Sequence, residues 1–372
     1  MRCDVLIIGA GPAGSSAARL LARAGRSVVL VEKSRFPRRK VCGEFISATT
    51  MPVLEACGVA DAFDTAAGPM VTRVGAYSGD AMLTAPAHKN WGRALGREHL
   101  DTMLRDAALA AGAVVLQPAE VVDFRRTDQG FVAMLDDGRE IAAHTVIAAC
   151  GSWNTKGPFA ISDTGPAASD LFAFKAHFRK SALPPGLMPL LAFPGGYGGL
   201  VHSDDGRTSL SCCIRRDALA RARARHGGKA AEAVLAHVLE TTKGARLALG
   251  EAVLEGSFLA TGPIHPGIRK RQDDGVFCTG NIAGEAHPVI AEGISMAIQS
   301  SGLLAQLLIA GRAEDYAQAW KSRFALRIRA AAFFAHLAMN GAGRLAGSAL
   351  LRAAPGLLDF GARISGKAPL AA

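Results

Sequence analysis

The chain has 372 residues, of which 49% are hydrophobic and 20% charged, so it can bury a large core and is not intrinsically disordered. Its net charge is +10, but no basic run is interleaved with aromatic residues, so no nucleic-acid partner is expected. Seven scattered cysteines form no CxxC pair and no metal-like spacing with histidine, which predicts reduced thiols, no metal and a cytoplasmic protein. The sequence shows no signal peptide and no uncharged apolar run of about 18 residues, so no transmembrane helix is expected.

The first 32 residues have the pattern of a dinucleotide-binding unit. A short apolar strand (5–8) leads into a GAGPAG turn (9–14), a helix of small residues (15–24) and a second strand (27–31) that ends at Glu32. This order of strand, glycine turn, helix, strand and acid is typical of nucleotide sites and is more specific than the glycine spacing alone.

Each glycine of the turn has its own physical reason. Gly9 permits the tight turn, Gly11 lets the backbone approach a pyrophosphate, and Gly14 lets the helix pack closely on the strand. The helix N-terminus offers free N–H groups to phosphate oxygens. Glu32 lies 18 residues after Gly14, where an acid accepts hydrogen bonds from an unphosphorylated ribose, which favours FAD or NAD over NADP.

The middle of the chain alternates between two patterns. A basic loop (33–40), a short helix (50–60), a strand-rich stretch (70–93) and a helix (97–111) are followed by four predicted strands at 114–116, 121–125, 131–135 and 141–148. Longer strands without intervening helices come next, at 171–177, 190–193, 199–202 and 208–214. They predict an antiparallel sheet inserted into the α/β domain.

The C-terminal part returns to helices. Helices are predicted at 216–226 and 229–242, strands near 257–260 and 276–279, and a glycine-rich segment (280–293) opens a helix that runs to about residue 310. The last 60 residues are largely helical and rich in arginine, with phenylalanine and leucine between the charges. We consider two interpretations, helices that pack on the body of the protein and an amphipathic surface that contacts a membrane peripherally.

Five motifs in order give the chain its resemblance to a known family: the turn at 9–14, Cys42-Gly43-Glu44, Arg97-x-x-Leu100-Asp101, Cys150-Gly151-Ser152 and the segment 280–293. Together they resemble the FAD-dependent oxidoreductase superfamily that includes aromatic hydroxylases of the p-hydroxybenzoate hydroxylase type, geranylgeranyl reductases and flavin-dependent halogenases. The resemblance implies an α/β fold, with a Rossmann-like FAD-binding domain, an inserted antiparallel-sheet substrate domain and C-terminal helices. The implied FAD-binding domain is discontinuous (1–70, 95–165 and 270–311), the substrate domain covers 71–94 and 166–269, and the helical region covers 312–372.

The resemblance implies FAD as the cofactor, held at both ends. The residues that it implies at the FAD site are Gly9, Gly11, Pro12, Ala13, Gly14, Glu32, Lys33, Cys42, Gly43, Arg97, Val121, Gly151, Gly280, Asn281, Pro288, Glu292, Gly293 and Ile294. Asn281 stands where the family usually has an aspartate that bonds the ribityl chain, and an amide retains the hydrogen bond without the charge. The helix that begins near Gly293 would direct its N-terminus toward the flavin pyrimidine.

Within this superfamily the favoured function is a flavin monooxygenase that uses reduced FAD and O2 to hydroxylate an apolar aromatic, polyketide or isoprenoid molecule. The alternative is a reductase of carbon–carbon double bonds similar to geranylgeranyl reductases. A halogenase is less favoured because no Trp-x-Trp-x-Ile-Pro motif is present, and a non-catalytic flavin-binding protein is the remaining class. NAD(P)H is expected as a transient reductant, because no second glycine unit is present, with a separate electron donor as the alternative. His287 is the candidate catalytic residue, and Phe174, Phe193 and Tyr197 are the candidate substrate contacts.

Overall fold

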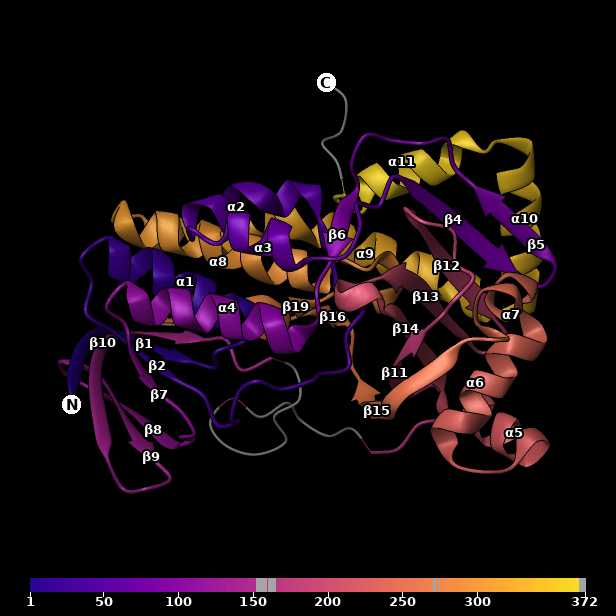
Figure 1. Cartoon of the computed structure of the whole chain (residues 1–372). Helices are drawn as coiled ribbons and strands as arrows, with labels where there is room; N and C mark the ends of the chain where they lie inside the picture. Colours follow the sequence, from indigo (N-terminus) through magenta and orange to yellow (C-terminus); the bar gives the residue numbers. More distant parts are fainter. Residues whose placement is uncertain (152–158, 160–164, 270–271, 274, 368–372) are drawn as a thin grey trace.

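The computed structural model describes residues 1–151, 159, 165–269, 272–273 and 275–367 (Figure 1). Ser152 of the Cys150-Gly151-Ser152 motif therefore lies outside the described residues. Two sheets dominate the fold and lie side by side, each with its own set of helices (Figure 1).

The first sheet forms the α/β half of the molecule. Its main path runs β17-β18-β10-β1-β2-β7, and the pair β8–β9 extends from β10. Its strands are β1 Arg2–Ile8, β2 Val28–Val31, β7 Val114–Leu116, β8 Val121–Thr127, β9 Gly130–Leu135, β10 Glu140–Ala148, β17 Gln272–Asp273 and β18 Val276–Cys278. Its helices are α1 Pro12–Arg23, α2 Met51–Ala56, α3 Ala60–Ala66, α4 Arg97–Ala110 and α8 Gly293–Ile309.

The central strand β1 pairs in parallel with β10 along one edge and with β2 along the other, and both of its faces are covered. Val5 and Ile7 pack beneath α1 and α8, whereas Leu6 and Ile8 pack with Phe131 and neighbouring residues of the β8–β9 side. A strand that is covered on both faces has an apolar run instead of an alternating pattern, which explains the sequence of β1. The Rossmann-like fold class predicted from the sequence is confirmed.

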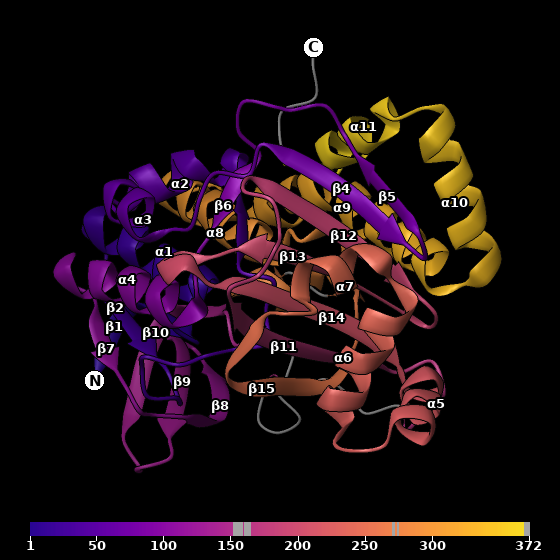
Figure 2. The ribbon, with the colours of Figure 1, turned by 45° about the vertical axis from the view of Figure 1, so that its right-hand side comes forward.

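The second sheet has seven strands in the order β15-β11-β14-β13-β12-β4-β5. Its strands are β4 Arg73–Ser78, β5 Ala81–Thr84, β11 Leu171–Arg179, β12 Leu187–Phe193, β13 Gly196–His202, β14 Thr208–Arg215 and β15 Val253–Ile264. Helices α5 Arg216–His226, α6 Ala230–Thr241 and α7 Lys243–Leu249 lie beside it (Figure 2). Two short ribbons complete the strand set, β3 Phe45–Ser47 with β6 Gly92–Ala94, and β16 Gly267–Ile268 with β19 Gly284–Glu285.

The second sheet is mostly antiparallel, as the sequence predicts, and it contains one parallel pair that the sequence did not predict. Strands β4 and β12 run parallel, from the pair Arg73 and Leu187 to the pair Ser78 and Ala192. The physical reason is that β4 comes from a separate segment of the chain, so that no hairpin joins it to β12 and fixes an antiparallel orientation. The other neighbouring pairs of this sheet are antiparallel.

The predicted C-terminal helices are present as α9 Tyr316–Met339, α10 Gly341–Ala353 and α11 Gly356–Ile364. Helix α9 buries Trp320, Phe324 and Ile328 in the core that also contains α1 and α8. Helices α10 and α11 form an outer edge beside β4 and β5 (Figure 2). Within the described residues, no helix is long and apolar enough to cross a membrane.

Candidate active site

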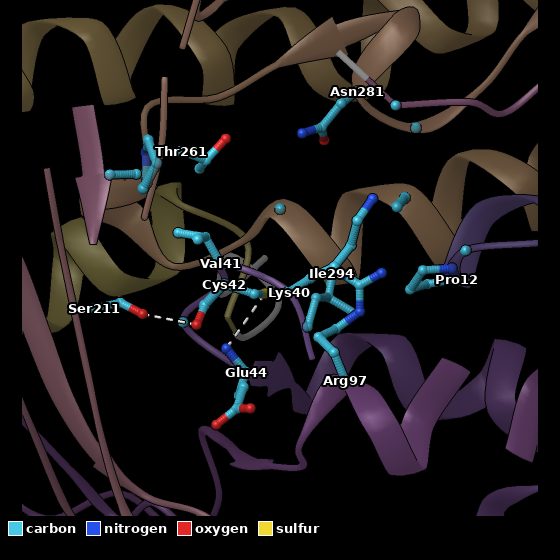
Figure 3. A pocket seen from close by; sticks show the side chains of 18 of the residues that line it. Pro12, Lys40, Val41, Cys42, Glu44, Arg97, Ser211, Thr261, Asn281 and Ile294 are labelled. Carbon is cyan, nitrogen blue, oxygen red and sulfur yellow. Dashed lines mark hydrogen bonds between the residues drawn. The ribbon is translucent and has the colours of Figure 1, made fainter. Parts of the chain in front are cut away.

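A single cavity of about 590 Å³ runs from the glycine turn of β1–α1 to the second sheet. Figure 3 shows Lys40, Arg97 and Pro12 at one end, Asn281 across from them, and Thr261 and Ser211 toward the sheet. Segments far apart in the sequence meet here, because the turn after β1, the loop after β2, the start of α4 and the start of α8 all open onto the same space.

The glycine turn has the close contacts that its sequence predicts. A Cβ on Gly14 would lie 1.8 Å from the carbonyl oxygen of Gly9, and Gly9 itself has a φ of 104°, in the region that favours glycine. Gly11 is the residue before α1, and the helix has no side-chain cap and no acid in its first turn. Its N–H groups and positive end are therefore available to an anion in the cavity.

Glu32 lies at the end of β2 and lines the cavity. Its carboxylate accepts hydrogen bonds from the backbone N–H groups of Ala10 (2.9 Å) and Ser34 (2.8 Å), and from Arg38 (2.7 Å). These bonds fix the carboxylate beside the glycine turn, which is the placement that a ribose diol requires.

Positive charge gathers where the cavity meets the N-terminus of α1. Arg97 is buried and holds Asp101 with two hydrogen bonds of 2.6 and 2.7 Å. Burial alone would lower the pKa of the Arg97 guanidinium, but the ion pair with Asp101 raises it above its ordinary value. Burial, together with the charges of Arg38 and Arg97, lowers the pKa of Lys40 to about 8. A buried cluster of cations beside a helix N-terminus fits a pyrophosphate.

Another part of the cavity wall, across from Lys40 and Arg97, is formed around Asn281 and the start of α8. Asn281 Nδ2 donates to Glu285 (3.1 Å), and both residues line the cavity. A Cβ on Gly293 would meet no atom within 4 Å, so that the backbone there is open to a flat ring. The first residues of α8 thus leave room for a flavin, and the helix dipole would favour negative charge on it.

The carboxylate of Glu292 lies outside the cavity. It accepts hydrogen bonds from Ser47 (3.1 Å) and from Lys367 (3.2 Å), which belongs to the segment after α11. Lys367 also donates to the carbonyl of Ile290. Burial raises the pKa of Glu292 and lowers that of Lys367, while their ion pair opposes both shifts. Glu292 therefore holds the start of α8 in place through its neighbours.

Sequence reasoning missed a buried ionic network in the loop Cys42-Gly43-Glu44. The Glu44 carboxylate pairs with Lys175 and lies 2.8 Å from His177 Nε2, and all three side chains are at most 1% exposed. His177 Nδ1 lies 3.4 Å from Arg39. Burial alone would raise the pKa of Glu44, but the bond to His177 and the charge of Lys175 lower it to about 2. The network joins the flavin loop to β11 of the second sheet.

The second sheet contributes an apolar wall to the cavity. The residues of this sheet that line it are Ala173, Phe174, Met188, Leu190, Tyr197, Gly198, Gly199, Leu200, Val201, Ser211, Cys212, Cys213, Leu259, Ala260, Thr261 and Ile264. Among the described residues of the sheet, none with an ordinarily charged side chain lines the cavity. This wall suits an apolar ligand.

Of the three candidate substrate contacts, Phe174 and Tyr197 border the cavity and Phe193 does not, but the Phe174 side chain packs in the same core as Phe193. Phe193 is fully buried in the core between the second sheet and its helices, together with Leu187 and Leu191. Successive side chains of a strand point to opposite faces, so Met188 and Leu190 face the cavity and Phe193 faces away. The expectation for Phe193 as a substrate contact is therefore corrected.

His287 lies behind Tyr197 and is not part of the cavity wall. The Tyr197 hydroxyl and His287 Nδ1 are 3.1 Å apart. Burial lowers the pKa of His287 to about 4, so the imidazole is neutral at pH 7 and shares a hydrogen bond with the Tyr197 hydroxyl. Burial raises the pKa of Tyr197 well above its usual value, which keeps its hydroxyl protonated.

The comparisons with known proteins agree with this geometry. Residues 2–158 match the family model described as the FAD binding domain. These residues, the N-terminal part of the chain, therefore form an FAD-binding domain. A menaquinone reductase from Mycolicibacterium smegmatis is 26% identical over 338 residues, which is 86% of this chain and 79% of that protein.

Two solved structures have the same architecture, each with a TM-score of 0.76. The flavin-dependent brominase Bmp2 is 20% identical, and the match covers 99% of this chain and 94% of the brominase. A geranylgeranyl bacteriochlorophyll reductase-like protein from Thermoplasma acidophilum is 18% identical, with 98% and 92% covered. The two proteins are named for different reactions, so these structural similarities establish the fold and not the reaction.

The structure brings together most of the predicted FAD-site residues of this flavoprotein. Those that line the cavity are Gly9, Gly11, Pro12, Ala13, Glu32, Lys33, Cys42, Gly43, Arg97, Val121, Gly151, Gly280, Asn281, Pro288, Gly293 and Ile294. Gly14 and Glu292 do not line the cavity. Gly14 packs closely against Gly9, and Glu292 forms an ion pair with Lys367. The residues present therefore fit FAD, with the cations at the pyrophosphate, Glu32 at the ribose and α8 at the flavin ring.

Replacing Lys40 with methionine is expected to weaken FAD binding by roughly tenfold to a hundredfold, the worth of one charged hydrogen bond. In the wild type, affinity should fall as the pH rises through about 8, because the Lys40 ammonium loses its proton there and no longer attracts the pyrophosphate. Fluorescence titration of the apoprotein with FAD at several pH values measures both effects. The exposed Lys89→Met variant is the control, and an unchanged affinity in Lys40→Met would contradict the assignment.

Proposed function

We propose that this flavoprotein is an FAD-dependent reductase that saturates a carbon–carbon double bond in an apolar, isoprenoid-bearing substrate such as a prenylated quinone. The observation that carries the proposal is the wall from the second sheet, to which the described strands contribute apolar and neutral polar side chains only. The extended similarity to a menaquinone reductase supports the same substrate class. This choice places the reductase ahead of the monooxygenase that the motifs alone favoured.

The wall argues against a substrate that must be ionised before it reacts. Hydroxylation of a phenol is helped by a base that takes the phenolic proton. The ionisable side chains that the second sheet adds on the cavity side are Tyr197 and Cys213, and burial raises the pKa of each. These groups hold protons at neutral pH, so they suit an acid more than a base.

Reduction of a double bond adds a hydride and a proton to its two carbons. FAD, when bound and reduced, supplies the hydride, and NAD(P)H is our proposed source of the electrons. Tyr197 borders the cavity, and its protonated hydroxyl, which lies 3.1 Å from His287 Nδ1, is our proposed source of the proton. The aliphatic wall excludes water and holds the chain of the substrate against the flavin position.

The test is anaerobic incubation of the holoprotein with NADH or NADPH and a prenylated quinone, followed by mass spectrometry after the extract has been oxidised in air. A product that retains two extra hydrogen atoms supports the reductase. A product that reverts to the starting mass shows reduction of the quinone ring alone, and an added oxygen atom that appears only in aerobic reactions shows a monooxygenase. Either of these two results would overturn the proposal.

A charged side chain in the wall provides the matched control. Leu190→Glu places a carboxylate on the cavity wall and is expected to lower turnover by at least about a hundredfold, because the apolar substrate would have to desolvate it. Leu254→Glu adds the same charge on β15 at a side chain that is 39% exposed and outside the cavity. Both variants should retain FAD, and equal turnover in the two would count against the wall as the substrate site.

A further inference from the structure

Helix α10 presents its apolar side to solvent. Its residues Leu345 and Leu350 are 77% and 57% exposed, and Ala342, Ala346, Ala349 and Ala353 are exposed as well. At 100° per residue these six positions fall on one side of the helix. The side that faces the protein contains Gly343, which is the one buried residue of α10. A surface helix of a globular protein normally has the reverse arrangement.

The two helices that contact α10 also expose large apolar side chains. On α11, Leu357 and Phe360 are 37% and 55% exposed. On α9, Leu326 and Phe333 are 64% and 61% exposed, and Phe334 stacks edge-on against Phe333 with 5.8 Å between the ring centroids. We call the seven large residues of these three helices the C-terminal apolar surface. They are Leu326, Phe333, Phe334, Leu345, Leu350, Leu357 and Phe360.

The charges on the helices that carry the C-terminal apolar surface are almost all positive. Between residues 316 and 367 the sequence has eight lysines and arginines and a single acid, Asp359, which pairs with Arg363 at 2.8 Å. Arg323 and Arg329 are exposed on α9, where the helical spacing places them on either side of Leu326 and Phe333. Arg352 is exposed on α10 beside the side that contains Leu345. An apolar side bordered by arginines matches the interface of an anionic lipid membrane.

We propose that the C-terminal apolar surface docks this protein on an anionic lipid membrane, with α10 lying in the plane of the interface. The described part of the chain has no membrane-spanning helix, so docking would be peripheral. A second copy of the chain fits the surface less well. A two-fold interface sets a patch against itself, and here it would place the bordering arginines of both copies close together. Lipid phosphates would neutralise the same arginines.

Membrane docking would also bear on the proposed reductase activity. Isoprenoid-bearing molecules partition into membranes, so docking would bring the enzyme to its substrate, and this link alone rests on the proposed reductase activity. The docking itself rests on exposure and charge and can be tested without turnover.

The experiment is co-flotation of the full-length holoprotein with two kinds of vesicles, phosphatidylcholine alone and phosphatidylcholine mixed with phosphatidylglycerol. We expect binding to the anionic vesicles that weakens at high salt, and little binding to the neutral ones. Leu345→Glu with Leu350→Glu should reduce binding by at least about tenfold, since it replaces two inserted side chains by carboxylates. Arg323→Gln, Arg329→Gln and Arg352→Gln together should remove the preference for anionic lipid.

The control variant is Leu109→Glu with Val122→Glu, at residues that are 55% and 48% exposed on α4 and β8, at the other end of the molecule (Figure 1). It should float like the wild type. Equal flotation of the Leu345/Leu350 variant, or no flotation of the wild type, would overturn the proposal. So would a wild-type dimer that this variant dissociates, because the surface would then bind a second copy.

A turnover assay with a detergent-solubilised substrate separates the two proposals. The Leu345/Leu350 variant should be as active as the wild type in detergent and at least about tenfold less active on substrate embedded in vesicles. Normal docking with no reduction of the substrate would contradict the reductase alone. Reduction in detergent without any docking would contradict the membrane proposal alone.

Discussion

Replacing Gly14 with alanine is expected to abolish FAD binding and to destabilise the flavoprotein by about 3 kcal/mol or more. The new Cβ would lie 1.8 Å from the carbonyl oxygen of Gly9 and 3.2 Å from the Cβ of Ala149. Neither can yield locally, because Gly9 belongs to the turn and Ala149 follows directly after β10. Helix α1 would move away from β1, and its N-terminus would leave the pyrophosphate position.

Two measurements follow this change, the ratio of flavin to protein absorbance after purification and the midpoint of thermal unfolding. Gly347→Ala is the control, since a Cβ there meets nothing within 4 Å and the residue lies within α10. The control should bind FAD normally and gain up to about 1 kcal/mol, the helix preference of alanine over glycine. Normal flavin content in Gly14→Ala would show that the turn has no role in holding the cofactor.

Lys175→Met is expected to destabilise the protein by about 3–5 kcal/mol, because the buried carboxylate of Glu44 loses its ammonium partner and keeps only His177 beside it. Adding Glu44→Gln to this variant should restore most of the loss, since the uncompensated charge then disappears. Chemical denaturation of the wild type, the two single variants and the double variant measures the coupling. A double variant as unstable as the sum of the single ones would argue that the pair does not interact.

The same pair predicts how stability depends on pH. The pKa of Glu44 is about 2 in the folded protein, below its ordinary value of 4.5, so the unfolded chain binds the proton more tightly. The stability that Glu44 contributes is therefore complete above pH 4.5 and is lost as the pH falls toward 2. In Glu44→Gln with Lys175→Met this part of the acid dependence should vanish.

The sequence predicted the nucleotide end of the site well because its signals are local. The spacing of Gly9, Gly11, Gly14 and Glu32 is set by one turn and one helix, and the structure places them as the pattern requires. Arg97 could be predicted from its motif for the same reason. The coarse fold followed from the alternation of strands and helices.

The rest of the site depends on contacts that no local pattern carries. Glu44 and Lys175 are separated by 131 positions, and the pairing of β11 with its neighbours decides that they meet. Phe193 and Leu190 are both apolar residues of β12, and only the register of the strand decides which one faces the cavity. A signal was present for Glu44, since it directly follows Cys42-Gly43, but its partners could not be named.

The position of Lys367 in the sequence decides when, during synthesis, its ion pair with Glu292 can form. A ribosome completes β1 and the glycine turn first, yet β1 acquires its partner β10 only after residue 148, and α8 follows residue 293. Lys367, near the end of the chain, then supplies the ammonium that the buried Glu292 needs. A nascent chain therefore displays the phosphate-binding turn long before residue 367 has been added, and the flavin end of the site is held in place only after that point.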